Sequence, residues 1–316
     1  MDIAPNIRPA RPGRFQDLAP ARAADVLEPP DGPVIRGRYR GSAVSLYEWR
    51  CGGHGQAHPA EEWADAHEVV IPRRGAFEWQ IAGARVLADP GSATFFHPTE
   101  PYRVRHPLPG GDAGSVFRLT PDGVRALVGE HDPGAAELPR ARFPRNHAPI
   151  DGRTYLLHRL AMRAAADPTA GPMEVEERAM AFLRAATAQA YRATAPAVRR
   201  GRAAEAAARV SEVVAARYRE PLRLAEIARV VGLSPFHLSR LVTAVTGVPI
   251  YRMIIRRRLR DALELLLETR EGITTIALAV GFASHSHLTD AFRREYGVPP
   301  RAVRRRGAAA ATAPRR

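Results

Sequence analysis

The C-terminal part of the chain carries one short pattern twice. The first copy reads Leu224-Ala-Glu-Ile-Ala228-Arg-Val-Val-Gly232-Leu-Ser234, and the second reads Ile273-Thr-Thr-Ile276-Ala277-Leu-Ala-Val280-Gly281-Phe-Ala-Ser284. Ala228 and Gly232 recur 49 residues later, whereas Ser234 recurs 50 residues later, so the second copy has one extra residue in its turn. Apolar residues at helical spacing, a glycine suited to positive φ and a serine N-cap predict a helix, a turn and a second helix in each copy.

A single amphipathic helix is predicted between the two copies. From Pro249 to Glu268 apolar residues recur with a period near 3.6, and arginines cluster near the start of the segment, at Arg252, Arg256, Arg257, Arg258 and Arg260. A helix of about 20 residues is about 30 Å long. That length is close to the roughly 34 Å between successive major-groove faces of B-DNA. The spacing therefore predicts two reading helices that meet one face of a duplex.

The combined pattern resembles the C-terminal DNA-binding domain of the AraC/XylS family of bacterial transcription regulators. The resemblance is carried by Gly232-Leu-Ser234, His237-Leu-Ser-Arg240, Gly247-Val-Pro249, Val280-Gly281-Phe282, Ser284-His-Ser-His-Leu288 and Tyr296-Gly-Val-Pro-Pro300. It implies that the second helix of each copy enters the major groove. The DNA-contacting residues that it implies by position are Phe236, His237, Ser239 and Arg240 in the first copy and His285, Ser286, Asp290 and Arg293 in the second.

Two positions depart from the family pattern. Asp290 stands where Arg240 stands in the first copy, and a carboxylate cannot bind phosphate but can accept from a cytosine amino group. The second reading helix is thus expected either to read a step that contains cytosine or to add little affinity. Val303 stands where the family usually has an aromatic residue, which leaves the docking of the last segment open. We expect Arg240 to contact guanine directly, and Arg256 and Arg257 to contact phosphates.

The positive charge is concentrated in the same part of the chain. The 316 residues carry a formal net charge of +14. Residues 201–316 hold 21 arginines against 10 acidic residues, a net +11, whereas residues 1–200 hold 26 against 23, a net +3. A basic half suits binding to phosphates with release of counterions. The alternative is a merely basic, solvated surface. The basic residues are all arginine, with no lysine, and this indicates that genome composition has raised their number.

The composition bounds the class of protein. No apolar run approaches 18 residues, and the N-terminus lacks the apolar stretch of a signal peptide. The single cysteine, Cys51, excludes an internal disulfide framework. We therefore expect a cytoplasmic protein of two or three domains that does not enter a membrane.

The segment before the repeated pattern reads as β structure. After a Pro-, Ala- and Arg-rich start, short apolar or alternating segments separated by turn residues predict strands at 43–49, 67–71, 76–81, 85–87, 93–97, 102–106 and 115–119. Strands with such spacing form a small sandwich or barrel. The order of turn residues between Gly75 and Pro101 resembles the cupin-like effector domain that is fused to many AraC/XylS members. The resemblance implies a small-molecule effector, with His67, Trp79, His97 and Tyr102 as candidate effector-binding residues.

Histidines gather in this β-rich segment and raise the alternative of a metal site. Together with Cys51 and Glu62, they are His54, His58, His67, His97 and His106. Metal-binding cupins resemble this segment but carry a His-x-His pair, where this chain reads Ala66-His67-Glu68, and a later histidine, where this chain has Tyr102. An organic-ligand pocket is therefore favoured, and no metal, cofactor or catalytic residue is predicted. Redox sensing by Cys51, with His54 nearby, stays open beside simple burial.

Helical patterns follow a Pro-rich bridge at 120–150. The segments 151–166 and 173–193 each have an apolar stripe, which we interpret as a dimerisation surface in preference to packing on the barrel, and 202–219 is the first scaffold helix. The predicted domains are a disordered arm (1–32), a cupin-like effector domain (33–120), a bridge and helical segment (121–196), a DNA-binding domain (200–305) and a disordered tail (306–316). The predicted fold class is multidomain α and β, with a cupin-like β-barrel or sandwich, a helical linker pair and an all-α double helix-turn-helix.

These patterns together predict a sequence-specific transcription regulator that is not an enzyme. The expected partners are double-stranded promoter DNA, a small-molecule effector, RNA polymerase and a second copy of the chain. A metal-dependent cupin enzyme with an accessory DNA-binding domain is the main alternative. A nucleoid-associated DNA-binding protein without sequence preference is the second alternative.

Overall fold

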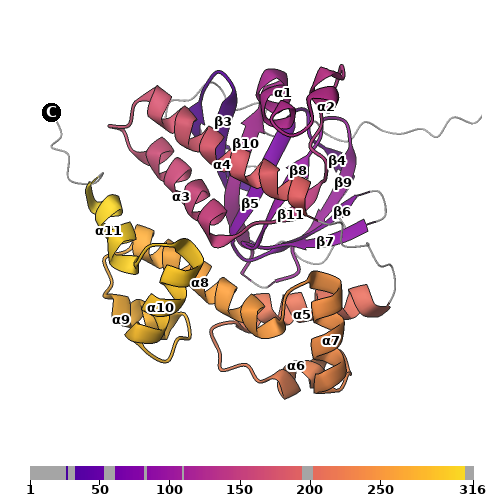
Figure 1. The fold of residues 1–316 in the computed structure, drawn as a ribbon, viewed down its shortest axis with the longest axis vertical. Coiled ribbons are helices and arrows are strands. Elements are labelled where there is room, and N and C mark those ends of the chain that lie inside the picture. Colours follow the sequence, from indigo (N-terminus) through magenta and orange to yellow (C-terminus); the bar gives the residue numbers. More distant parts are fainter. Residues whose placement is uncertain are drawn as a thin grey trace, which may run out of the picture.

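The structure is a computed structural model that describes residues 26–27, 33–52, 61–81, 84–108, 110–193 and 202–309. A β-rich unit covered by helices comes first along the chain, and an all-α unit follows it (Figure 1). The predicted fold class is confirmed. Most of the predicted arm and the residues 194–201, which lead into the predicted DNA-binding domain, lie outside the described residues.

Two antiparallel sheets make up the β-rich unit. The larger has the strand order β1-β2-β3-β10-β5-β8-β11, and the smaller has the order β4-β9-β6-β7. The strand bounds are β1 Val26–Leu27, β2 Val34–Arg40, β3 Val44–Cys51, β4 Glu62–Trp63, β5 His67–Arg74, β6 Phe77–Ile81, β7 Ala84–Ala88, β8 Ser92–Phe96, β9 Pro101–Arg105, β10 Asp112–Leu119 and β11 His147–Pro149. All seven predicted strands are present. The strand β1 lies inside the segment predicted as a disordered arm, so that prediction is wrong for Val26–Leu27.

The larger sheet is buried on both faces. Along β5, Val69 and Ile71 pack with the helices on one face, whereas Val70 packs with Trp79 and other residues of the smaller sheet on the opposite face. Successive side chains of a strand point to opposite faces, so one strand contributes to two cores. One core lies between the two sheets. The other lies between the larger sheet and the helices.

Helices α3 (Gly152–Ala166) and α4 (Pro172–Arg192) pack on each other and on the outer face of the larger sheet (Figure 1). The rings of Phe117 on β10 and Phe182 on α4 are 4.7 Å apart at their centroids. The apolar stripes of both helices are therefore covered within the chain. The interpretation of these stripes as a dimerisation surface was wrong, because the sheet and neighbouring helices bury them.

Two short helices occupy the segment predicted as an irregular bridge. They are α1 (Pro121–Gly129) and α2 (Pro133–Glu137). The side chain of Thr120 accepts a hydrogen bond from the backbone N–H of Gly123 at 3.2 Å, and Pro121 takes the first helical position. A threonine N-cap followed by proline is a helix-start signal, and it was present in the sequence.

The all-α unit contains both copies of the repeated pattern. Its helices are α5 (Arg202–Arg217), α6 (Leu224–Val231), α7 (Pro235–Thr246), α8 (Ile250–Glu268), α9 (Ile273–Ala279), α10 (His285–Tyr296) and α11 (Pro300–Ala309). Ser234 and Ser284 cap α7 and α10 by accepting the backbone N–H three residues on, at 3.3 and 3.2 Å. Gly232 and Gly281 have φ of +76° and +89°. The predicted turns, caps and connecting helix are confirmed.

The end of the chain is docked more firmly than the sequence indicated. Val303 is buried in the same core as Leu288 and Phe292 of α10, so a small aliphatic residue fills the position where the family pattern has an aromatic one. Helix α11 continues to Ala309, four residues into the segment predicted as a disordered tail, so that prediction is wrong for residues 306–309.

No single helix in the described part of the chain is long and apolar enough to cross a membrane, although α7 and α8, bent by 63° at their junction, pass that test as a pair on length and composition alone.

Candidate nucleic-acid interface

Helix α7 presents one polar and aromatic face to solvent. Leu238 and Val242 are buried against α5 and α6, which fixes the inward side of the helix. On the outward side Phe236 is 73% exposed, and His237 and Arg240 are exposed as well. The guanidinium carbon of Arg240 lies 5.5 Å from the centroid of the Phe236 ring, so cation–π attraction favours an outward, extended arginine. Ser239 is half-buried on the same helix.

Helix α10 repeats this arrangement with different chemistry. Leu288 and Phe292 are buried inward, while Ser286, Asp290 and Arg293 are exposed and His285 is half-buried. The carboxylate of Asp290 forms no ion pair within the described ranges. Arg294 donates to the backbone carbonyl oxygen of Asp290, at 3.2 Å, and not to its carboxylate. Asp290 is therefore free to accept a hydrogen bond from a ligand. It repels phosphate, as the sequence indicated.

The two reading helices lie near opposite ends of α8 (Figure 1). A helix of 19 residues is about 28 Å long. Arg258, half-way along α8, donates to the backbone carbonyl oxygens of Tyr218 and Glu220, at 2.6 and 2.7 Å, and also to that of Gly281. This one side chain therefore ties the segment before α6 and the turn after α9 to the same rod.

The two arginines predicted to contact phosphate lie differently. Arg256 is about one-third exposed and approaches Glu295 of α10, with 3.8 Å between Nε and Oε1. Arg257 is only 7% exposed, and its Nη2 donates to the carbonyl oxygen of Gly75 in the β-rich unit at 3.1 Å. The prediction for Arg257 was wrong for this arrangement, because its side of α8 packs against the β-rich unit instead of facing solvent.

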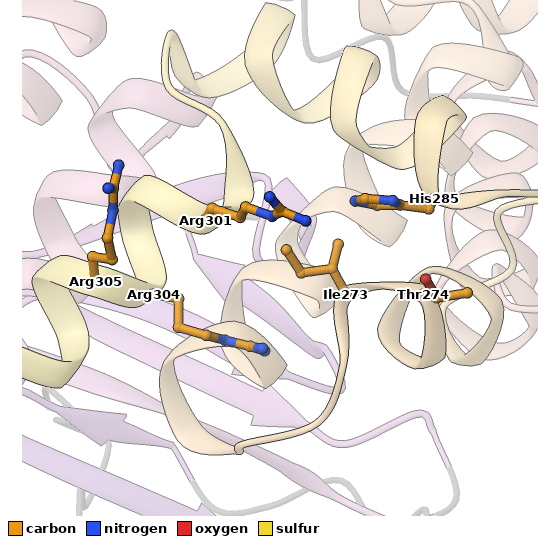
Figure 2. A pocket seen from close by; sticks show the side chains of 6 residues that line it. All are labelled: Ile273, Thr274, His285, Arg301, Arg304 and Arg305. Carbon is orange, nitrogen blue, oxygen red and sulfur yellow. The ribbon is translucent and has the colours of Figure 1, made fainter.

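An open groove lies beside α10 and contains arginines that the sequence analysis did not single out. It has a volume of about 680 Å³ and is lined by Ile273, Thr274, His285, Arg301, Arg304 and Arg305. Figure 2 shows Arg301 extending from α11 toward His285 at the start of α10. The sequence signal was the run Pro300-Arg301-Ala-Val303-Arg304-Arg305, in which Val303 faces inward and the arginines flank it.

The four predicted effector-binding residues do not share one site. Trp79 and Tyr102 lie between the two sheets, and both rings contact Phe96, at centroid distances of 5.2 and 4.7 Å. His67 and His97 lie on the opposite face of the larger sheet, with their Nδ1 atoms 3.2 Å apart. The four candidates therefore lie on two different faces of the larger sheet, because the alternation along β5 and β8 sends the histidines toward the helices.

The two histidines sit in an apolar setting. Both rings pack against Phe143, at centroid distances of 6.2 and 6.1 Å. Burial lowers the pKa of His67 to about 4 and that of His97 to about 3. Both are neutral at pH 7, and they can share one proton as donor and acceptor.

Polar groups without partners lie between the sheets. Glu68 and Thr94 share the inward face with Val70, since Glu68 pairs with Phe96 and Thr94 with Val70 across the ladder. Burial raises the pKa of Glu68 to about 8, so its carboxyl is protonated at pH 7. The Nε1 of Trp79 and the Oγ1 of Thr94 are buried without a hydrogen-bond partner among the residues that the structure describes. These groups offer hydrogen bonds to a molecule bound between the sheets.

Cys51 lies in a hydrogen-bonded cluster at the edge of the same core. It contacts His106, which pairs with Asp112, and Asp112 also accepts from the Nε1 of Trp49 at 2.9 Å. Burial pushes the pKa of His106 down, but the hydrogen bonds to Asp112 and Cys51 outweigh it and raise the pKa to about 10. Within the described ranges no three His, Cys, Asp or Glu side chains lie close enough to hold a metal. His54 and His58 fall outside those ranges.

Comparison with known proteins places this geometry in a family. A helix-turn-helix domain family matches residues 227–306. The HTH-type transcriptional regulator GlxA of Rhizobium meliloti (strain 1021) is 38% identical over 86 residues, which cover 27% of this chain and 26% of GlxA. The HTH-type transcriptional activator RhaS of Escherichia fergusonii is 26% identical over 253 residues, which cover 77% of this chain and 87% of RhaS. Residues 227–306 form an AraC-type helix-turn-helix domain.

The chain spans about a quarter of the length of GlxA. Among solved structures, an apo single-residue variant of ToxT from Vibrio cholerae covers 84% of this chain and 97% of its own, with 12% identity and a TM-score of 0.37.

The AraC-type domain holds eight of the ten predicted DNA-contacting residues on α7 and α10. Six of them are exposed, while Ser239 and His285 are half-buried. The remaining two are on α8, where Arg256 is half-buried and Arg257 is buried. The groove arginines of α11 extend the basic surface on the side of α10.

Proposed function

We propose that the protein is a sequence-specific transcription regulator whose AraC-type domain binds promoter DNA. The observation that carries the proposal is the pair of capped reading helices, α7 and α10, whose polar faces are exposed near the two ends of α8. A recognition helix that lies in the major groove contacts base edges through its solvent-facing side chains. The relatives compared above are transcription regulators, so the enzyme alternative is not carried further.

The two reading helices are proposed to have different base preferences. Arg240 is exposed on α7 and held over Phe236, and its forked guanidinium matches the two acceptors of guanine in the major groove. Asp290 on α10 has no cationic partner in the described ranges and would accept from the amino group of cytosine. A site with a guanine contact in one half and a cytosine contact in the other is the expected target.

Phosphate contacts are proposed for arginines that stay in solvent while α8 is docked. Arg252 is exposed on the first turn of α8, and Arg301 and Arg305 are exposed on α11. Arg304 lines the same groove as Arg301, and its Nε and Nη2 are buried without a partner. Phosphate contacts add affinity and register without reading sequence.

An effector is proposed to bind between the two sheets. The rings of Trp79 and Tyr102 both pack edge-to-face on Phe96 there, and the neutral carboxyl of Glu68 and the indole N–H of Trp79 are hydrogen-bond donors. These groups favour a small organic molecule with an apolar body and an acceptor group such as a carbonyl. Apolar pockets with a few convergent polar groups are typical ligand sites.

The remaining partners and the location are proposed from the resemblance. RNA polymerase is the further partner, since a regulator bound at a promoter acts on transcription there, and the cytoplasm is the location where both occur. A homodimer is also proposed, although the apolar stripes of α3 and α4 are covered within the chain. Sedimentation in the presence of specific DNA measures how many copies of the chain bind one site. A 1:1 complex on a full site would count against the dimer.

Selection of bound fragments from sheared genomic DNA, at about 150 mM salt and with nonspecific competitor, tests the proposed function. We expect enrichment of one motif with two half-sites about one helical turn apart. The matched variant Arg240→Ala is expected to relax the motif at one base pair. Recovery of fragments without a shared motif would indicate a binder without sequence preference and would overturn the proposal.

A further inference from the structure

A cavity of about 390 Å³ lies between the β-rich unit and the AraC-type domain. On one side it is lined by the turn that follows β5, around Gly75, and by Pro90 and Gly111. On the other side it is lined by the end of α5 and by α8. We call this space the interdomain cavity. Its volume suits a small molecule and is far too small for a segment of duplex.

The lining of the interdomain cavity is strongly basic. The arginines that line it are Arg73, Arg74, Arg219, Arg257 and Arg260, and among the described lining residues Asp261 is the one carboxylate. Asp261 is already neutralised, since it accepts from Arg219 at 2.7 Å and from the hydroxyl of Tyr218 at 2.8 Å. Arg73 and Arg74 are neutralised as well, by Glu48 and Glu268, both at 2.7 Å.

Two of these arginines are buried without a carboxylate partner in the described structure. Arg260 is 2% exposed and is satisfied by backbone, because its two Nη atoms donate to the carbonyl oxygens of Pro90 and Ile150. Arg257 is not satisfied. Within the described part of the chain it makes one hydrogen bond, to the carbonyl oxygen of Gly75, and its Nε and Nη1 are buried with no partner there. Its guanidinium carbon also lies 5.1 Å from the centroid of the Tyr218 ring.

A buried guanidinium whose Nε and Nη1 have no hydrogen-bond partner is unfavourable unless an anion pairs with it. Arginine presents a planar fork that pairs with carboxylate or phosphate oxygens through two parallel hydrogen bonds. Arg257 lines a cavity large enough for such a group, and its Nε and Nη1 are buried beside it without a partner among the described residues. This position therefore offers an oxyanion both a positive charge and unpaired hydrogen-bond donors.

We propose that the interdomain cavity binds a small oxyanion-bearing molecule, a phosphate or a carboxylate, which pairs with Arg257. The ligand touches both units, because Gly75 and Pro90 come from the β-rich unit and Arg257 comes from α8. Its binding therefore holds α8 against the β-rich unit. The site is separate from the proposed effector site between the sheets, which is lined by aromatic rings and neutral polar groups.

Anion binding to the full chain tests the proposal without any DNA. Calorimetric titrations with sodium phosphate and with sodium citrate, at an ionic strength kept constant with sodium chloride, are expected to show saturable 1:1 binding of at least one of the two anions. Arg257→Gln should weaken that binding at least tenfold. The matched control Arg140→Gln removes an exposed arginine outside the AraC-type domain and the cavity lining, and it should bind the anion as the wild type does.

Thermal unfolding separates a ligand site from a purely structural arginine. In anion-free buffer Arg257→Gln should leave the melting temperature unchanged or raise it, and only the wild type should gain stability as phosphate or citrate is added. Ala216→Phe, an exposed position on the lining, should fill the space and block binding even if Arg257→Gln does not fold. Absence of saturable binding of both anions to the wild type, or unchanged binding to Arg257→Gln or Ala216→Phe, would overturn the proposal. Neither result would touch the proposed DNA-binding function.

Discussion

Arg159 of α3 and Glu264 of α8 form an ion pair with 2.7 Å between Nε and Oε1, and their side chains are only 6% and 1% exposed. The hydroxyl of Tyr155 donates to the same carboxylate at 2.8 Å. The pair lies where the rod that joins the two reading helices meets the β-rich unit. The mutual position of the two units therefore depends on charges that water does not screen.

Breaking this pair on one side should be costly. Glu264→Ala leaves the buried Arg159 guanidinium with only the longer pair to Glu268, at 3.3 Å, and we expect it to lower the free energy of unfolding by about 3 kcal/mol. The double variant Arg159→Met with Glu264→Leu removes both charges, so its free energy of unfolding should fall much less. Urea unfolding of the three proteins measures the difference. A loss below about 1 kcal/mol for Glu264→Ala would show that the pair does not hold the units together.

The caps of the two reading helices offer a local test of the repeated pattern. Ser234→Ala and Ser284→Ala each remove the acceptor of one backbone N–H, so each should cost about 1 kcal/mol of stability. Replacement by glycine should cost only a few tenths. Equal stability of the alanine variants and the wild type would mean that these serines do not act as caps.

Arginines on the two parts of the interface should differ in what they change. Arg240→Ala should lose about 1 to 3 kcal/mol of binding free energy, mainly at one base pair of the site. Arg301→Ala should weaken binding to all sequences alike and lower the slope of log K against log salt by about one. Quantitative gel shifts over a series of salt concentrations, on specific and random DNA, check both. Equal losses on the two DNAs for Arg240→Ala would remove it from the base-reading set.

The buried carboxyl between the sheets should give stability a distinct pH dependence. An acid whose pKa is raised on folding, here from 4.5 to about 8 for Glu68, contributes stability that is present below the lower value and is lost as the pH rises through the higher one. Glu68→Gln stays neutral throughout. The free energy of unfolding of this variant should equal that of the wild type near pH 4. Above pH 8 it should be larger, by about 1.4 kcal/mol for each pKa unit of the shift.

Thermal unfolding of the Glu68→Gln variant and the wild type between pH 4 and pH 9 measures this difference. Glu78→Gln, at a half-buried position on the neighbouring sheet that is paired with Arg105, serves as the control. A Glu68→Gln difference that stays constant over the whole range would show that the carboxyl is not held neutral.

Much of the fold followed from local patterns. The spacing of apolar residues, the glycines at positive φ and the capping serines fix the helices of the AraC-type domain, because each of these signals acts within a few residues. The strands were equally visible as short apolar segments between turns. The two short helices after Thr120 were missed because the prolines there were interpreted as breaks, although proline is well suited to a first helical turn.

The errors concern positions that local patterns cannot settle. Both faces of the larger sheet are apolar, so alternation separates His67 from Glu68 but does not say which of them faces the smaller sheet. Arg257 and Arg252 belong to the same arginine cluster, and only the packing of α8 on the β-rich unit buries one and exposes the other. Such distinctions depend on contacts between residues that are distant along the chain.

Hydroxyl-radical footprinting of the full chain on its selected DNA tests the central claim most directly. Two reading helices near the ends of one rod should protect two segments on the same face of the duplex, about 10 base pairs apart. Arg240→Ala should weaken one of the two protections more than the other. A single protected segment, or uniform protection along the fragment, would contradict the account.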